Sequence, residues 1–132
     1  MDVGEWHTQL LLVLPGGALG GMARYILSEW TARRSGGHRP YGTLAVNLSG
    51  AFAIGVTAAL PWSALSSAHE AFAHGFLLHG FLGGYTTVST FSAQTLYLMQ
   101  NGAFRIGVAN LLASGTLCIA AAFAGGLVAR LI

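Results

Sequence analysis

The chain has 132 residues, of which 54% are hydrophobic and 8% are charged, and its mean hydropathy is +0.62. In a soluble domain about a quarter of the residues are charged, so this composition indicates a membrane protein. Six arginines and four acidic residues give a net charge of +2, with no basic patch of the kind that binds nucleic acid. We therefore predict one membrane-embedded domain over residues 1–132, with the lipid bilayer as its surroundings and no nucleic-acid partner.

Four apolar stretches are long enough to cross a bilayer, which takes about 20 mainly apolar residues in a helix. They cover approximately residues 8–30, 42–62, 71–99 and 105–132. Short polar connections separate them, and the last of these is a turn at Asn101-Gly102. The pattern predicts an all-α membrane protein with four transmembrane helices and both termini on one side of the membrane.

The third stretch contains an uncharged run of small and hydroxyl-bearing residues from Gly83 to Ser92. Glycine and β-branched residues form helices less readily than alanine or leucine. An unpaired peptide group in hydrocarbon costs several kcal/mol, unless it is buried in protein or lines a hydrated path. The run therefore predicts a third helix that is broken at its centre, and it marks the first candidate site.

Polar and small residues fall on shared helix faces, because positions three or four apart lie on one side of a helix. The predicted stripes are Gly16, Gly20, Arg24 and Ser28 in the first span, Thr43 and Asn47 in the second, and Asn110, Ser114 and Cys118 in the fourth. The glycine pairs Gly16/Gly20 and Gly80/Gly84 predict close helix packing.

Two interpretations of these stripes stay open. Arg24 is either functional or lies near enough to the span end for its guanidinium to reach the interface. Asn47 and Asn110 either form interhelical hydrogen bonds, worth about 1 kcal/mol each, or face one cavity together with the hydroxyls of the third span.

The chemistry of these polar residues favours a small anion or a neutral solute. Amides, hydroxyls and a guanidinium are hydrogen-bond donors, whereas a cation pathway is usually lined by carboxylates. No acid lies within a predicted span to orient a histidine for nucleophilic catalysis, so an enzyme is not expected. His69, His74 and His79 are spaced by five residues. This spacing rotates each by about 140° from the last on an α-helix, so no shared metal-ligand face is expected.

Two motifs connect this chain to a known family. Gly42-Thr43-Leu44-Ala45-Val46-Asn47-Leu48 opens the second span, and the third contains Gly80-Phe81-Leu82-Gly83-Gly84-Tyr85-Thr86-Thr87-Val88-Ser89-Thr90-Phe91-Ser92. Together with the glycine-rich first span and the Asn110 to Ser114 stretch, they resemble the Fluc/CrcB fluoride channels over nearly the whole chain. The resemblance implies a passive, fluoride-selective channel in the bacterial inner membrane, through which toxic fluoride leaves the cytoplasm. It also implies an antiparallel, dual-topology dimer with two pores along the subunit interface.

The resemblance also implies roles for particular residues. Asn47 would donate a hydrogen bond to fluoride, and Phe91 would present its ring edge. The further polar lining would come from Ser89, Thr90, Thr43, Asn110 and Ser114. The backbone carbonyls of Gly83 and Thr86 would meet those of the second subunit around a central structural Na⁺.

Three features depart from the family pattern. Val88 stands where the family commonly has a first pore phenylalanine, and Gln94 stands where relatives often have glutamate, so both residues, with Arg24, are candidates for gating or structural roles. The arginines at span ends are also unequal: Arg33, Arg34, Arg39 and Arg105 flank one side and Arg130 the other. The positive-inside tendency then orients the N-terminus outward. Because a dual-topology homodimer prefers near balance, a homologous subunit of opposite orientation is the alternative partner.

Two other functions compete with the channel. The chain length and span count also fit a small, dimeric, four-span multidrug-type exporter, although such an exporter normally needs a membrane carboxylate. The third interpretation is an accessory subunit that packs without transporting anything, which the polar run of the third span argues against.

Overall fold

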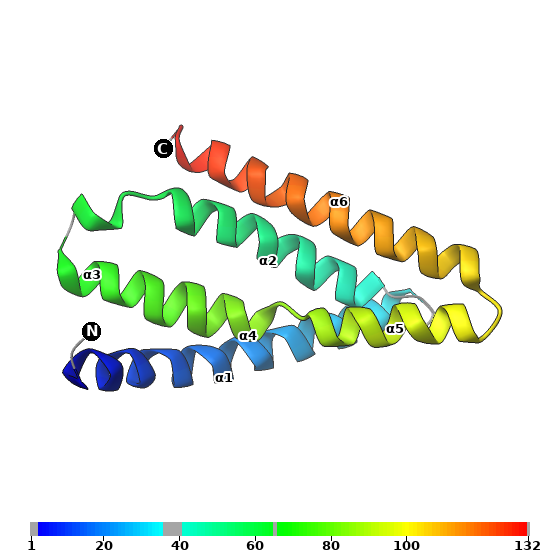
Figure 1. Ribbon diagram of the computed structural model, residues 1–132, viewed down its shortest axis with the longest axis horizontal. Coiled ribbons are helices and arrows are strands. Elements are labelled where there is room, and N and C mark those ends of the chain that lie inside the picture. The colour runs from blue at the N-terminus through cyan, green and yellow to red at the C-terminus, as the bar shows by residue number, and fades with distance from the viewer. Residues whose placement is uncertain (1–2, 36–40, 65, 132) are drawn as a thin grey trace.

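The computed structural model describes residues 3–35, 41–64 and 66–131, and within these ranges the chain forms helices and turns with no strand. Three helices are each long and apolar enough to cross a bilayer: α1 (Val3–Arg34), α2 (Tyr41–Ala59) and α6 (Phe104–Ala129) (Figure 1). The prediction of an all-α protein with membrane-spanning helices is therefore confirmed for the part of the chain that the structure describes.

Shorter helical segments connect α2 to α6. They are the 3₁₀ turn η1 (Trp62–Ala64), α3 (Ser67–Phe72), the π-helix η2 (Ala73–Leu82), α4 (Gly83–Tyr85) and α5 (Val88–Gln100). Between α4 and α5 the backbone is extended, with φ −76° and ψ 157° at Thr86 and φ −149° and ψ 121° at Thr87. The two termini lie at the same end of the molecule (Figure 1).

The helix ends differ from the predicted ones for local reasons. α2 ends at Ala59 and not at residue 62. Pro61 disfavours the α conformation at the residue before it, Leu60, so the helix stops there. α1 continues to Arg33 and Arg34, whose positive charges favour a helix C-terminus. The predicted turn at Asn101-Gly102 is confirmed, and Gly102 has a φ of +80°. The final predicted residue of the fourth span, Ile132, lies outside the described residues.

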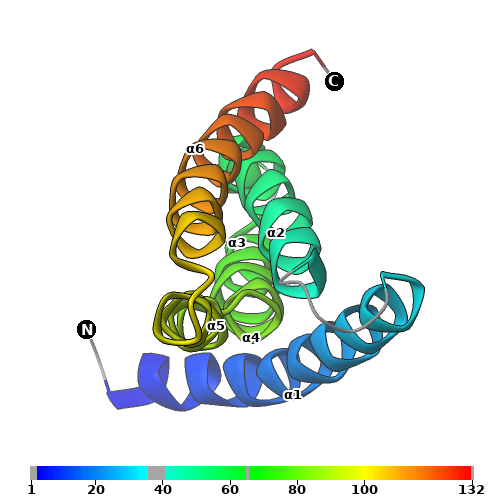
Figure 2. The same ribbon diagram turned by 90° about the vertical axis from the view of Figure 1, so that its right-hand side faces the viewer.

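Glycines set the helix packing. α1 packs against η2 and α4, and α2 packs along α6; Figure 2 shows α1 crossing on one side of α4 and α5, with α2 and α6 on the other. A methyl group added at Gly20 would collide with the Phe81 carbonyl, and one at Gly125 with the Phe52 carbonyl. A Cβ at Gly84 would lie 2.5 Å from the Gly17 carbonyl oxygen. The predicted close approach of helices at glycine pairs is confirmed.

The expectation for the histidines is wrong for one pair. The rotation of about 140° applies to an α-helix, but Ala73–Leu82 forms a π-helix, in which hydrogen bonds join residues five apart. The rings of His74 and His79 consequently lie on one face, with centroids 6.5 Å apart.

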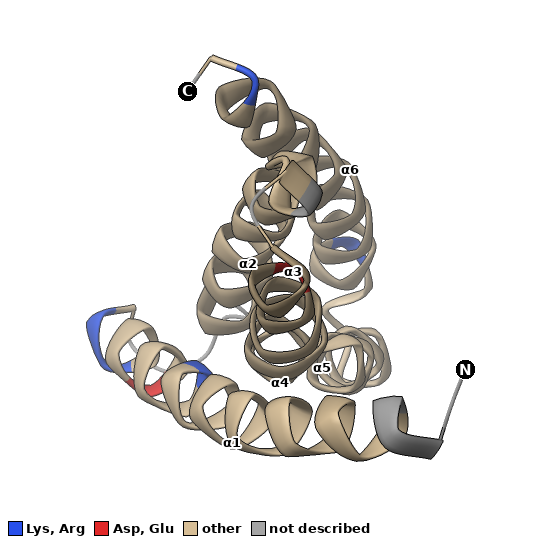
Figure 3. Cartoon of the chain, turned by 90° about the vertical axis from the view of Figure 1, so that its left-hand side faces the viewer, with Lys and Arg blue, Asp and Glu red and all other residues tan. Residues whose placement is uncertain are grey.

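The surface is apolar. Among the described residues, the buried hydrophobic side chains are few, namely Val46, Ala73, Leu82 and Ala129, while many large apolar side chains of α1, α5 and α6 are exposed. Charged residues are sparse over the same chain (Figure 3). So large an exposed apolar surface is suited to lipid or to a second subunit.

Candidate functional site

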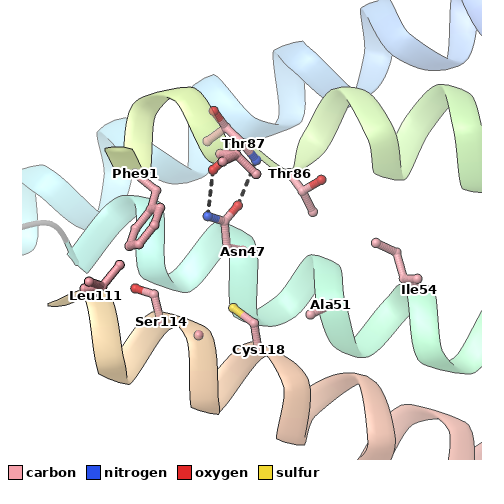
Figure 4. Close-up of a pocket in the computed structure, with 11 residues that line it drawn as sticks. Asn47, Ala51, Ile54, Thr86, Thr87, Phe91, Leu111, Ser114 and Cys118 are labelled. Carbon is pink, nitrogen blue, oxygen red and sulfur yellow. Dashed lines mark hydrogen bonds between the residues drawn. The ribbon is translucent and has the colours of Figure 1, made fainter. Parts of the chain in front are cut away.

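A groove of about 360 Å³ lies beside the extended Thr86-Thr87 segment, between α2, α5 and α6 (Figure 4). It is lined by Asn47, Ala51, Ile54, Thr86, Thr87, Val88, Phe91, Leu111, Ser114, Gly115 and Cys118. Of the sequence-predicted site residues, the groove brings together Asn47, Phe91, Ser114, Thr86 and Val88. No acidic or basic side chain is among these described lining residues.

Asn47 binds the extended segment through both ends of its amide. Its Nδ2 donates to the Thr87 carbonyl at 2.8 Å, and its Oδ1 accepts from the Thr87 N–H at 2.8 Å. These bonds satisfy both backbone groups of a residue that is only 7% exposed. An amide nitrogen carries two hydrogens, and this contact uses one of them. Asn47 can therefore hold the extended segment and still donate one hydrogen bond.

Two hydrogen bonds at the break leave the carbonyls of Gly83 and Thr86 without their α-helical partners. In an α-helix the N–H of residue i+4 bonds to the carbonyl of residue i. The Thr87 N–H, which would pair with Gly83, bonds to Asn47. The Thr90 N–H, which would pair with Thr86, bonds to Thr87 Oγ1 at 3.2 Å. Backbone carbonyl oxygens are suitable ligands for Na⁺, so the two carbonyls of Gly83 and Thr86 fit such an ion.

A hydroxyl cluster caps the start of α5. Thr87 Oγ1 lies 3.2 Å from Ser89 Oγ and accepts a hydrogen bond from the Thr90 N–H, while it donates to Thr90 Oγ1 at 3.1 Å. Ser89 and Thr90 are exposed and are not among the residues that line the groove. Both hydroxyls therefore lie at the end of α5 beside the extended segment.

Phe91 and Ser114 face one another across the groove, with Asn47 beside them (Figure 4). Ser114 is 7% exposed, and Cys118 lies one turn further along α6. Val88 is 77% exposed at the edge of the groove. A ring edge, an amide and a hydroxyl are thus close together, and each presents a partial positive charge to a small anion.

The other predicted residues lie outside the groove lining. Asn110 is buried and its Nδ2 donates to Thr95 Oγ1 at 2.8 Å, as the interhelical hydrogen-bond interpretation expects. Thr43 is buried on α2, and Arg24 is partly exposed on α1. Gln94 Oε1 is buried with no hydrogen-bond partner among the described residues. The predicted stripe on α6 is therefore divided between the α5–α6 contact and the groove.

Sequence reasoning did not single out two polar residues as site residues. Thr87 is the residue to which Asn47 bonds, and Thr95 is the partner of Asn110. The sequence around Thr87 offers only a weak signal for a helix N-cap. A capping box would have Glu or Gln three residues after the threonine, and this chain has Thr90 there. No local signal pointed to Thr95, because its partner is on a different helix.

Comparison with known proteins identifies the family. The profile described as "CrcB-like protein, Camphor Resistance (CrcB)" matches residues 11–126. The chain is 44% identical over 115 residues to "Fluoride-specific ion channel FluC 3" of Brucella suis biovar 1, covering 87% of this chain and 86% of that protein. It is 43% identical over 120 residues to "Fluoride-specific ion channel FluC" of Solibacter usitatus, covering 91% and 97%. It is also 45% identical over 124 residues to "Fluoride-specific ion channel FluC" of Anaeromyxobacter dehalogenans, covering 92% and 95%. The chain therefore belongs to the CrcB family.

Proposed function

We propose that this chain is a subunit of a passive, fluoride-selective channel that lets fluoride leave the bacterial cytoplasm through the inner membrane. Its relatives are named fluoride-specific ion channels. The observation that carries the proposal is the position of Asn47, which holds the extended segment and keeps one N–H beside Phe91 in a groove with no acid.

In this proposal the segment from Ser67 to Gln100 forms the third of four membrane crossings, as a helix broken at Thr86-Thr87. The shorter segments follow one another along the long axis of the molecule, and the two termini lie at one end (Figure 1). This arrangement is consistent with an even number of crossings. The unpaired backbone at the break is tolerable in a membrane because Asn47 satisfies Thr87 and the groove adjoins it.

The groove forms part of the wall of a fluoride pathway. Fluoride is small and tightly hydrated, so it crosses only where donors replace its water closely. Asn47, the Phe91 ring edge and Ser114 supply such donors in the groove. Four further polar side chains extend the pathway beyond the groove: Thr43 and Asn110, which are buried, and Ser89 and Thr90, at the start of α5. Gln94 and Arg24 retain a gating or structural role.

A second subunit completes the pathway in this proposal. The exposed apolar side chains around α5 and α6 suit an antiparallel homodimer with dual topology. The unequal arginines favour a fixed orientation and hence a homologous subunit of opposite orientation as the alternative partner. One of these arginines, Arg39, lies outside the described residues.

We further propose that the carbonyls of Gly83 and Thr86 hold a structural Na⁺ between the subunits. When bound, the ion supplies a positive charge that stabilises backbone oxygens left without helical partners. Gly83 is exposed on the subunit surface, so its carbonyl is available to a contact between subunits.

Removing sodium is expected to destabilise the assembled protein. A ligand that binds only the folded state stabilises it by about 2.7 kcal/mol at a concentration of 100 times its Kd. Thermal unfolding of the purified protein in detergent should therefore shift to lower temperature when Na⁺ is replaced by N-methylglucamine at equal ionic strength. Equal unfolding temperatures in both salts would exclude the Na⁺ site.

Liposome flux tests the function itself. The purified protein is reconstituted into potassium-loaded liposomes, and fluoride and chloride efflux are followed after valinomycin is added. Fluoride efflux with little chloride efflux and no proton coupling is the expected result. Proton-linked export of a cationic drug would support the multidrug alternative, and no transport at all would support an accessory subunit.

Replacing Phe91 with isoleucine is expected to lower fluoride efflux, because the substitution removes the ring edge from the groove while retaining most of the apolar volume. We expect a reduction of about 2- to 10-fold, since an aromatic contact contributes about 0.5–1.5 kcal/mol. The dimer should still elute intact on size exclusion. Phe104→Ile, on an exposed phenylalanine outside the groove, is the matched control. Unchanged flux in Phe91→Ile would remove Phe91 from the pathway.

Replacing Val88 with phenylalanine is expected to preserve fluoride transport. Val88 is 77% exposed at the edge of the groove, so a larger ring has room in the subunit and restores the family pattern. Fluoride efflux from liposomes, measured beside the parent protein, should stay within a few-fold. Complete block would mean that this chain has packed its pathway around the smaller valine side chain.

A further inference from the structure

The π-helix η2 presents two histidines on one exposed face. Hydrogen bonds in a π-helix join residues five apart, so such residues are neighbours on successive turns of the helix. The rings of His74 and His79 have centroids 6.5 Å apart and planes inclined by 34°. Both side chains are exposed. The backbone thus holds the pair together on the outer surface of the described chain.

On the opposite face of η2, two glycines five residues apart pack against α1. Gly75 and Gly80 each follow one of the histidines and are buried. A Cβ at Gly75 would lie 3.1 Å from Leu12 Cβ, and one at Gly80 would lie 3.0 Å from Gly16 Cα. The repeated His-Gly pair therefore places both glycines against α1 and both histidines away from it. The close contact with α1 supports the π register independently of the histidines.

We propose that His74 and His79 form a two-imidazole site for a borderline divalent transition-metal ion such as Cu²⁺, Ni²⁺ or Zn²⁺. Imidazole nitrogen is a preferred ligand of these ions. Because each metal–nitrogen bond is about 2.0–2.1 Å, two imidazoles on one ion have centroids roughly 5–6 Å apart. The observed 6.5 Å closes to this range by a small rotation of the side chains.

The site is limited to two protein ligands. No group of three His, Cys, Asp or Glu residues that could hold a metal ion occurs in the described part of the chain. An ion held by only two protein ligands is exchangeable. His69 lies five residues before His74, but it belongs to the α-helical α3, where its Nδ1 lies 2.7 Å from Ser66 Oγ. It is therefore the matched control.

Copper titration of the purified full chain tests the site. We expect the electron paramagnetic resonance spectrum of one bound Cu²⁺ to show two imidazole nitrogens. His74→Gln and His79→Gln should each remove that signal and weaken Cu²⁺ binding at least tenfold, while His69→Gln should leave both unchanged. Calorimetry with Ni²⁺ gives a second measurement of affinity. If either single variant keeps the two-nitrogen spectrum, or affinity within twofold of the parent, the site is overturned.

A register variant tests the role of the π-helix. Combining Leu77→His with His79→Leu leaves histidines three residues apart, which are neighbours on an α-helix but lie further apart around the wider turn of a π-helix. We expect this variant to lose the two-nitrogen spectrum while it elutes as the parent does on size exclusion. Parent-like copper affinity in the register variant would overturn the proposal, because an α-helical segment would then carry the binding.

Discussion

Replacing Asn47 with leucine is expected to abolish most fluoride transport and to destabilise the subunit. Leucine has a similar volume but makes neither bond to Thr87, and each buried polar group left unpaired costs about 1–3 kcal/mol. A lost hydrogen bond to a charged ligand costs about 1.5–3 kcal/mol, so we expect fluoride efflux to fall by about 10- to 100-fold. Liposome flux and thermal unfolding in detergent measure the two effects.

Asn47→Asp separates the two roles of this residue. Aspartate keeps an acceptor for the Thr87 N–H and loses the bond to the Thr87 carbonyl, so it retains half of the contact that leucine removes. It has no N–H to donate, and its negative charge repels an anion. We expect this variant to elute as the parent does on size exclusion and to conduct little fluoride. Ser49→Ala is the control on the same helix, since Ser49 bonds to Tyr85 at 2.8 Å and lies outside the groove lining. Normal efflux through Asn47→Leu would refute the proposed pathway.

The helices were predictable because hydropathy and local breakers are properties of neighbouring residues. The apolar stretches predicted α1, α2 and α6 to within five residues of their ends, and Asn101-Gly102 predicted its turn. The polar run predicted an interruption near Gly83 to Ser92, but not the residue at which the backbone becomes extended. That position depends on Asn47, which is 40 residues earlier in the chain and bonds to Thr87.

The errors concern contacts between helices. An α-helical period places His74 and His79 on different faces, whereas the packing of Gly75 and Gly80 against α1 accompanies a π register. The stripe on α6 placed Asn110 with Ser114 correctly on one helix face. It could not reveal that Thr95 of α5 would take the Asn110 side chain away from the groove. Helical spacing predicts which face of its helix a residue occupies. Only the three-dimensional structure shows which residue of another helix it contacts there.

Replacing Gly20 with alanine is expected to destabilise the fold, although alanine favours a helix more than glycine does. The added methyl group would collide with the Phe81 carbonyl and approach the Tyr85 backbone nitrogen to 2.9 Å. These are backbone atoms of η2 and α4, so relief requires α1 to move. Overpacking of this kind costs about 1–3 kcal/mol. Thermal unfolding of the purified protein in detergent should shift accordingly to lower temperature.

Gly21→Ala is the matched control, and the two substitutions are expected to differ in sign. A Cβ at Gly21 meets no atom within 4 Å, so the higher helix propensity of alanine, about 1 kcal/mol, should raise the unfolding temperature or leave it unchanged. Any general effect of adding a methyl group to α1 is common to both variants. A difference between them therefore isolates the contact of Gly20 with Phe81. Equal stability of the two variants would mean that α1 does not approach η2 as closely as this packing requires.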